Sequence, residues 1–121
     1  MNIALWAGQI VLAAVFLASG IAKSTMSRER LLATGQTGVA VFPQPVVRFT
    51  AAMEVAGAAG LVVPWWTGIA TGLTPAAACG LCFVMIGAAS AHLRLHEPRN
   101  VAINGVLLAL CVFVAAGRLH G

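Results

Sequence analysis

The sequence predicts an all-α membrane protein, with four transmembrane helices forming a single domain over residues 1–121. Charged residues make up only 8% of the chain and hydrophobic residues 60%. A soluble domain carries about 25% charged residues, because its surface must face water. Four apolar segments, at residues 3–22, 46–63, 75–93 and 101–117, each approach the roughly 20 residues that a spanning helix needs.

The first segment, "IALWAGQIVLAAVFLASGIA", is expected to end at Lys23. The N-terminus lacks the charged n-region and the small-residue cleavage site of a cleaved signal peptide, so we interpret this segment as a retained anchor. The second segment is bounded by Pro45 and Pro64, two residues that commonly mark helix limits.

The connection between these segments is the longest in the chain. Its first part, "SRERLLATG", has Ser27 as a candidate N-cap and Gly35 as a candidate stop. The basic and leucine residues between them suit a short helix on the membrane surface, and a solvated loop is the alternative.

The third and fourth segments complete the bundle. None of the four alternates apolar and polar residues with a period of two, so spanning strands are excluded. The stretch between the second and third segments, "PWWTGIATGLTP", is uncharged, and we expect Trp65 and Trp66 to lie in this loop at the headgroup layer.

Basic residues set the expected orientation. Only Arg118 lies at the end that holds the second loop and both termini. The other six basic residues lie in or beside the first and third loops: Lys23, Arg28, Arg30, Arg48, Arg94 and Arg99. The positive-inside rule then places loops 1 and 3 in the cytoplasm and both termini outside a bacterial inner membrane. These residues occur singly and form no basic stripe, so the lipid bilayer is an expected partner and nucleic acid is not.

Glu54 is the most informative residue, because it lies within the apolar stretch "FTAAMEVAGAAG". A lone ionised carboxylate is costly there, so the carboxyl group must be protonated, paired with a positive charge or in contact with a wet cavity. Its helical neighbours at three and four residues' distance, Thr50, Ala51, Gly57 and Ala58, are all small. We therefore expect this face to point into the bundle.

Each of the other helices offers a polar group near the same end. Lys23 and Ser19 are four residues apart, and the flexible Lys23 side chain can reach toward Glu54. Arg48, about 240° around its helix from Glu54, is a weaker partner. The candidate pocket residues are Ser19, Lys23, Arg48, Glu54, His92 and Asn104. Three interpretations remain open: polar contacts that only fix helix packing, a pocket for a quinone or lipid-like molecule, and a proton or ion path.

Cys79 and Cys82 have the C-x-x-C spacing of thiol oxidoreductases, in which a helix N-terminus lowers the pKa of the first thiol. Their apolar surroundings favour inert packing residues instead. His92 and His96 alone are too few ligands for a metal site, so no metal is expected. No nucleophile, base and acid are arranged for catalysis, and we expect no enzymatic activity from the chain alone.

The whole chain resembles the DoxX-like family of small bacterial membrane proteins. The resemblance rests on "FLASGIAK", "VRFTAAMEVAGAAGLVVP", "SAHLRLHEPRN" and "NVAINGVLLAL", and on the order Lys23, Glu54, Pro64, His92 and Asn104. It implies an accessory or anchor subunit of a redox system, with a quinone as cofactor and a soluble oxidoreductase or another membrane subunit as partner. A purely structural or assembly role, a thiol redox protein and a small transporter formed as a homo-oligomer are the alternatives.

Overall fold

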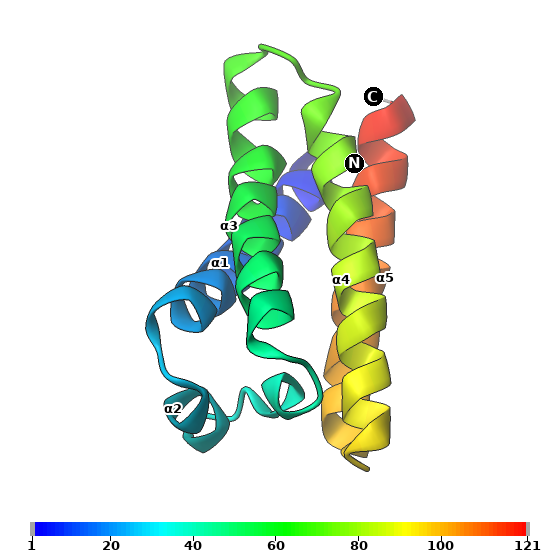
Figure 1. Ribbon diagram of the computed structural model, residues 1–121. Coiled ribbons are helices and arrows are strands. Elements are labelled where there is room, and N and C mark those ends of the chain that lie inside the picture. Colours follow the sequence, from blue (N-terminus) through cyan, green and yellow to red (C-terminus); the bar gives the residue numbers. More distant parts are fainter. Residues whose placement is uncertain (1, 121) are drawn as a thin grey trace.

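The computed structural model describes residues 2–120 as a bundle of long helices (Figure 1). Four of them, α1 (Asn2–Thr25), α3 (Gln44–Thr67), α4 (Leu73–Arg94) and α5 (Pro98–His120), are long and apolar enough to cross a membrane. The prediction of an all-α protein with four spanning helices is confirmed. Loops 1 and 3 lie at one end of the bundle, here called the loop-1 end, and the opposite end, which holds loop 2, is called the terminal end.

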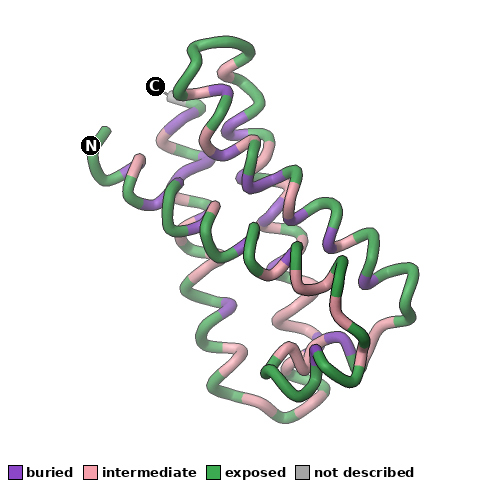
Figure 2. Tube along the Cα trace, turned by 90° about the vertical axis from the view of Figure 1, so that its left-hand side faces the viewer, coloured by how far each residue is buried: buried purple, intermediate pink, exposed green. Residues whose placement is uncertain are grey.

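The helices pack chiefly as two pairs, α1 with α3 and α4 with α5, joined by the contact between α3 and α4. Leu12, Phe16, Leu61, Leu81 and Val114 form the centre of the core. Large apolar side chains such as Phe49, Phe83 and Ile3 point outward, and exposed positions run along the outer faces of the helices in Figure 2. Apolar outer faces of this extent match a lipid environment.

Small residues let α1 and α3 approach closely. A Cβ atom added at Gly20 would lie 2.6 Å from Val55 Cγ2 and 2.9 Å from the Ala51 carbonyl oxygen. Ala51 and Ala58 are buried on α3, as the small-residue pattern around Glu54 predicted. The contact is thus made by backbone against backbone, the arrangement typical of small residues at membrane helix interfaces.

Each spanning helix extends beyond its expected ends; α5, expected over residues 101–117, covers Pro98–His120 and so includes Arg118. α1 continues past Lys23 to Thr25, so Lys23 lies within the helix and not beyond it. α3 was expected to end at Val63, but it runs through Pro64 and stops at Gly68, whose φ of 73° is left-handed. Trp65 and Trp66 therefore belong to the last turn of α3, and the prediction that they lie in loop 2 is wrong.

Neighbouring helices explain why α3 tolerates Pro64. Proline lacks the N–H that would bond the carbonyl four residues earlier, at Gly60. Thr74 Oγ1, at the start of α4, donates to the Gly60 carbonyl oxygen at 2.9 Å. Gln9 Nε2 of α1 donates to the next carbonyl, that of Leu61, at 2.5 Å. Replacement donors of this kind are how membrane helices accommodate proline.

Loop 1 is structured and covers the loop-1 end. It contains the short helix α2 (Arg28–Ala33) and the 3-10 helix η1 (Thr37–Ala40). Ser27 caps α2 by accepting from the Arg30 N–H, and Gly35 follows it with a φ of 98°. The short-helix interpretation of this segment is therefore confirmed over the solvated loop.

Loop 1 has a small core of its own. Leu31 of α2, Val39 of η1 and Val47 of α3 are buried together. Arg28 donates to the carbonyl oxygens of Val39 and Phe42 at 2.9 and 2.7 Å, which joins α2 to the rest of the loop.

The close contact of α1 with α3 generates a prediction. Gly20→Ala should destabilise the protein by about 1–3 kcal/mol, because the added methyl group meets backbone atoms that cannot yield without moving a helix. Gly105→Ala is the matched control, since nothing lies within 4 Å of the added atom. It should be neutral or stabilising by less than about 1 kcal/mol. Thermal unfolding in detergent, followed by circular dichroism, would measure both, and equal stability of the two variants would contradict the close contact.

Candidate ligand cavity

A cavity of about 860 Å³ lies at the loop-1 end, between the α1–α3 pair and the α4–α5 pair. Ligand pockets typically measure about 300–1,000 Å³. Its walls are mainly apolar, and loop 1 contributes Gly38, Val39 and Phe42 beneath them. The polar residues of its lining include Ser19, Lys23, Gln36, Glu54, His92 and Asn104.

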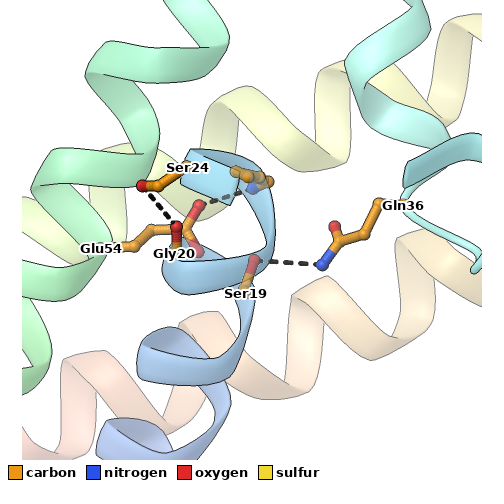
Figure 3. Close-up of polar contacts among 6 residues, drawn as sticks. Ser19, Gly20, Ser24, Gln36 and Glu54 are labelled. Carbon is orange, nitrogen blue, oxygen red and sulfur yellow. Dashed lines mark hydrogen bonds and ion pairs between the residues drawn. The ribbon is translucent and has the colours of Figure 1, made fainter. Parts of the chain in front are cut away.

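The strongest polar contact in the cavity is the ion pair between Lys23 and Glu54. Lys23 Nζ of α1 lies 2.5 Å from Glu54 Oε1 of α3. The Glu54 side chain is 1% exposed and the Lys23 side chain 14%. Figure 3 shows Glu54 reaching from α3 to the part of α1 that holds Gly20. The close approach at Gly20 thus brings two charged groups together that would each be costly to bury alone.

Ser19 and Gln36 extend the polar wall of the cavity toward loop 1. Gln36 Nε2 donates to Ser19 Oγ at 3.3 Å, a contact drawn in Figure 3. Ser19 lies one turn before Lys23 on the same helix. Loop 1 is therefore attached to α1 directly beside the ion pair.

Arg48 does not line the cavity. Its Nη1 donates to the Lys23 carbonyl oxygen at 2.8 Å, which satisfies one of the free carbonyls in the last turn of α1. Arg48 thus holds the backbone of Lys23 and does not contact the Glu54 carboxylate, as its place on the helix predicted.

Asn104 of α5 lines the cavity and has an unused side-chain donor. The residue is 8% exposed, and its Nδ2 has no hydrogen-bond partner among the residues the structure describes. Leaving a buried donor unpaired costs about 1–3 kcal/mol. Because Nδ2 itself is covered while the residue lines the cavity, the amide must turn before this donor can meet a ligand acceptor.

His92 closes the cavity toward loops 1 and 3. Its Nδ1 lies 2.8 Å from Glu97 Oε1, which also accepts from Thr37 Oγ1 at 2.7 Å. Hydrogen bonds from His92 first, then Thr37 and Asn100, hold the pKa of the Glu97 carboxyl below its ordinary value of 4.5. Glu97 lies in loop 3 and joins η1 to the end of α4.

Five of the six predicted pocket residues therefore line one cavity, and Arg48 lies outside it. That they bind a ligand stays a prediction. His96 lies beyond α4 in an exposed turn with a φ of 56°. Within residues 2–120, no group of three His, Cys, Asp or Glu side chains is placed to hold a metal ion.

The cysteines are separated by their surroundings. Cys79 is exposed, Cys82 is half-buried and packs against the central core, and Cys111 is buried within it. α4 begins at Leu73, which places Cys79 in the second turn. The field of a helix N-terminus is largely confined to the first turn, so this placement does not favour an activated thiol. A thiol redox role stays an untested prediction.

A second polar cluster, at the terminal end, was missed by sequence reasoning. Arg118 is 6% exposed and donates from Nε to Gln9 Oε1 at 2.7 Å and from Nη1 to Asn2 Oδ1 at 2.9 Å. Its guanidinium carbon lies 4.4 Å from the ring centre of Trp65 and 5.6 Å from that of Trp6. The available signal was Gln9, a lone polar residue inside an apolar helix, as Glu54 is.

Comparison with known proteins gives one match. The family model described as "DoxX-like family" matches residues 7–114. No curated protein and no solved structure matches the chain.

The buried ion pair predicts a specific pattern of stability. Lys23→Met should cost about 3–5 kcal/mol, because it leaves the Glu54 carboxylate buried without its partner. The double variant Lys23→Met with Glu54→Leu should recover most of that loss. Denaturant titration in detergent would measure the cycle, with the exposed Arg30→Met as control. Additive losses in the double variant would show that the two side chains do not interact.

Glu97 predicts a dependence of stability on acid. Because its pKa is lower in the folded protein, its contribution is fully present above the unfolded pKa of about 4.3 and is lost as pH falls through the folded pKa. As the pH falls below the unfolded pKa, the unfolding midpoint of the wild type should therefore fall more than that of Glu97→Gln. Thr37→Val, which removes one of the donors, should show an intermediate fall. Parallel curves for all three proteins would exclude this contribution.

Proposed function

The chain belongs to the DoxX-like family, and from this membership and its cavity we propose that it binds the head group of a quinone within the membrane, as an accessory subunit of a redox system. The protein is a multi-pass membrane protein with four apolar helices. Its cavity is therefore in contact with the phase in which quinones dissolve.

The unpaired amide of Asn104 is the observation that carries this proposal. A quinone ring has two carbonyl oxygens on opposite sides, and both accept hydrogen bonds. Asn104 on α5 and Lys23 on α1, which belong to different helix pairs, line the same cavity, and each carries a donor that a turn of its side chain would bring to a ligand. One ring held between them would satisfy the free amide at one carbonyl and meet a positive charge at the other.

The ion pair suits a role in positioning and in proton supply. Reducing a quinone to a quinol adds two electrons and two protons. Lys23 carries exchangeable protons beside the Glu54 carboxylate, and Glu54 would keep the ammonium in place. In this proposal the electrons come from a partner oxidoreductase.

The charge distribution supports a partner at the loop-1 end. Arg30, Arg94 and Arg99 are exposed there, beside loops 1 and 3. An oxidoreductase with an acidic face would be attracted to this surface. The same charge bias favours a cytoplasmic location of the loop-1 end in a bacterial inner membrane.

The second candidate function is structural, and the Lys23–Glu54 pair favours it because polar pairs fix helix register. Under that alternative the cavity is filled by lipid chains without selectivity. The two functions differ in what Asn104 does, since an amide with no partner in the protein contributes nothing to register.

Asn104→Leu tests the proposal. The variant should bind short-chain ubiquinone or menaquinone about 5-fold more weakly in nanodiscs, the equivalent of one lost hydrogen bond of about 1 kcal/mol. Its stability should be equal to or above that of the wild type, because an unpaired buried donor has been removed. Isothermal titration and thermal unfolding would measure the two quantities.

Asn100→Leu is the matched control, since Asn100 lies one turn earlier on α5 and does not line the cavity. It should retain wild-type quinone affinity. A wild-type protein that binds neither quinone, or an Asn104→Leu variant with unchanged affinity, would rule out the proposed site and leave the structural function.

A further inference from the structure

The cavity has two apolar openings, one between α1 and α5, where Val15 and Ile103 of its lining are 39% and 48% exposed, and one between α3 and α4. Phe49 and Met53 of α3 and Phe83 of α4 belong to its lining, yet they are 67%, 40% and 75% exposed. A side chain can line a cavity and be this exposed only where the cavity meets the outer surface. These residues therefore mark a lateral opening.

Glycines keep the α4 side of this opening clear. Gly80 and Gly87 lie seven residues apart, about two turns, and both line the cavity. A Cβ atom added at either glycine would have no atom within 4 Å, so no part of α3 covers them. The two helices are in contact at Leu81, between these two glycines, because a Cβ at Gly57 would lie 2.9 Å from the Leu81 side chain, so the separation begins on the Gly87 side of that contact. α3 and α4 thus separate toward the loop-1 end.

Structured residues of loop 1 narrow the path through the loop-1 end, where Thr34 and Gly35 of the cavity lining are exposed. α2 and η1 pack there on a small core of their own, and Arg28 and Thr37 fasten the loop by hydrogen bonds. Figure 1 shows this loop lying beneath the helix ends. The flank between α3 and α4 is formed by membrane-spanning segments and faces hydrocarbon.

We propose that the opening between α3 and α4 is a lateral portal, through which the isoprenoid tail of the quinone extends into the bilayer while its ring occupies the cavity. This inference rests on the proposed function and adds the orientation of the ligand and its route of entry. Polar donors at Lys23 and Asn104 hold the ring inside, and Phe49, Met53 and Phe83 contact the tail where it leaves. A tailed quinone enters and leaves from the membrane without crossing water.

The proposal makes tail length the discriminating variable. Gly87→Phe places a large side chain across the portal at a position where the protein leaves room for it, so folding is retained. Gly105→Phe is the control, because Gly105 is exposed on α5, has equal free space and does not line the cavity. Each protein would be titrated in nanodiscs with tailless duroquinone and with ubiquinone-2, which carries two isoprenoid units.

The expected result is that Gly87→Phe weakens ubiquinone-2 binding about 10-fold or more, with duroquinone affinity unchanged, while Gly105→Phe alters neither. Unchanged ubiquinone-2 affinity in Gly87→Phe would overturn the portal, as would a wild-type protein that binds duroquinone but not ubiquinone-2. In both of those outcomes the proposed ring site would stand. If the wild type binds neither quinone, the proposed function fails and the portal fails with it.

Discussion

The ion pair between Lys23 and Glu54 is the constraint on which the loop-1 half of the molecule depends. Two opposite charges at 2.5 Å, one of them almost wholly buried, tolerate little displacement of α1 relative to α3. The absence of a side chain at Gly20 permits the approach, and Arg48 holds the backbone of Lys23 at the end of α1. The pair therefore belongs to the packing of two helices and to the wall of a cavity at once.

The rest of the bundle separates around that fixed contact. α3 and α4 are tightly packed at the terminal end, where Thr74 and Gln9 satisfy the carbonyls around Pro64. Toward the loop-1 end they part, and loop 1 fills the base through its own core and through the Thr37–Glu97–His92 contact. The resulting cavity has mainly apolar walls, a polar cluster around Lys23 and Glu54, and apolar openings to the outer surface, which is the polarity that an amphipathic ligand requires.

The sequence supplied the number of helices, the short helix in loop 1 and the pairing of Lys23 with Glu54, because each follows from a local pattern. Lengths of apolar runs identify spans, capping residues identify α2, and a carboxylate among small residues must find a partner on a neighbouring helix.

Pro64 led to a wrong prediction for the end of α3. The helix continues through this proline because Thr74 and Gln9, from other helices, donate to the carbonyls of Gly60 and Leu61, and the sequence does not show that these residues meet. The cluster around Arg118 was missed for the same reason. Its Gln9 and Asn2 contacts join residues more than 100 positions apart. The portal is equally invisible in the sequence, since Gly80 and Gly87 resemble ordinary packing glycines.

The claim that one cavity binds a quinone with its ring inside and its tail between α3 and α4 is tested most directly by photocrosslinking. A ubiquinone analogue with a photoreactive group on its tail, irradiated with the wild-type protein in nanodiscs, would be mapped by mass spectrometry. Labels should concentrate on Phe49, Met53 and Phe83, and excess ubiquinone-2 should remove them. Labels spread evenly over the exposed apolar faces of all four helices, and unaffected by competitor, would contradict this claim.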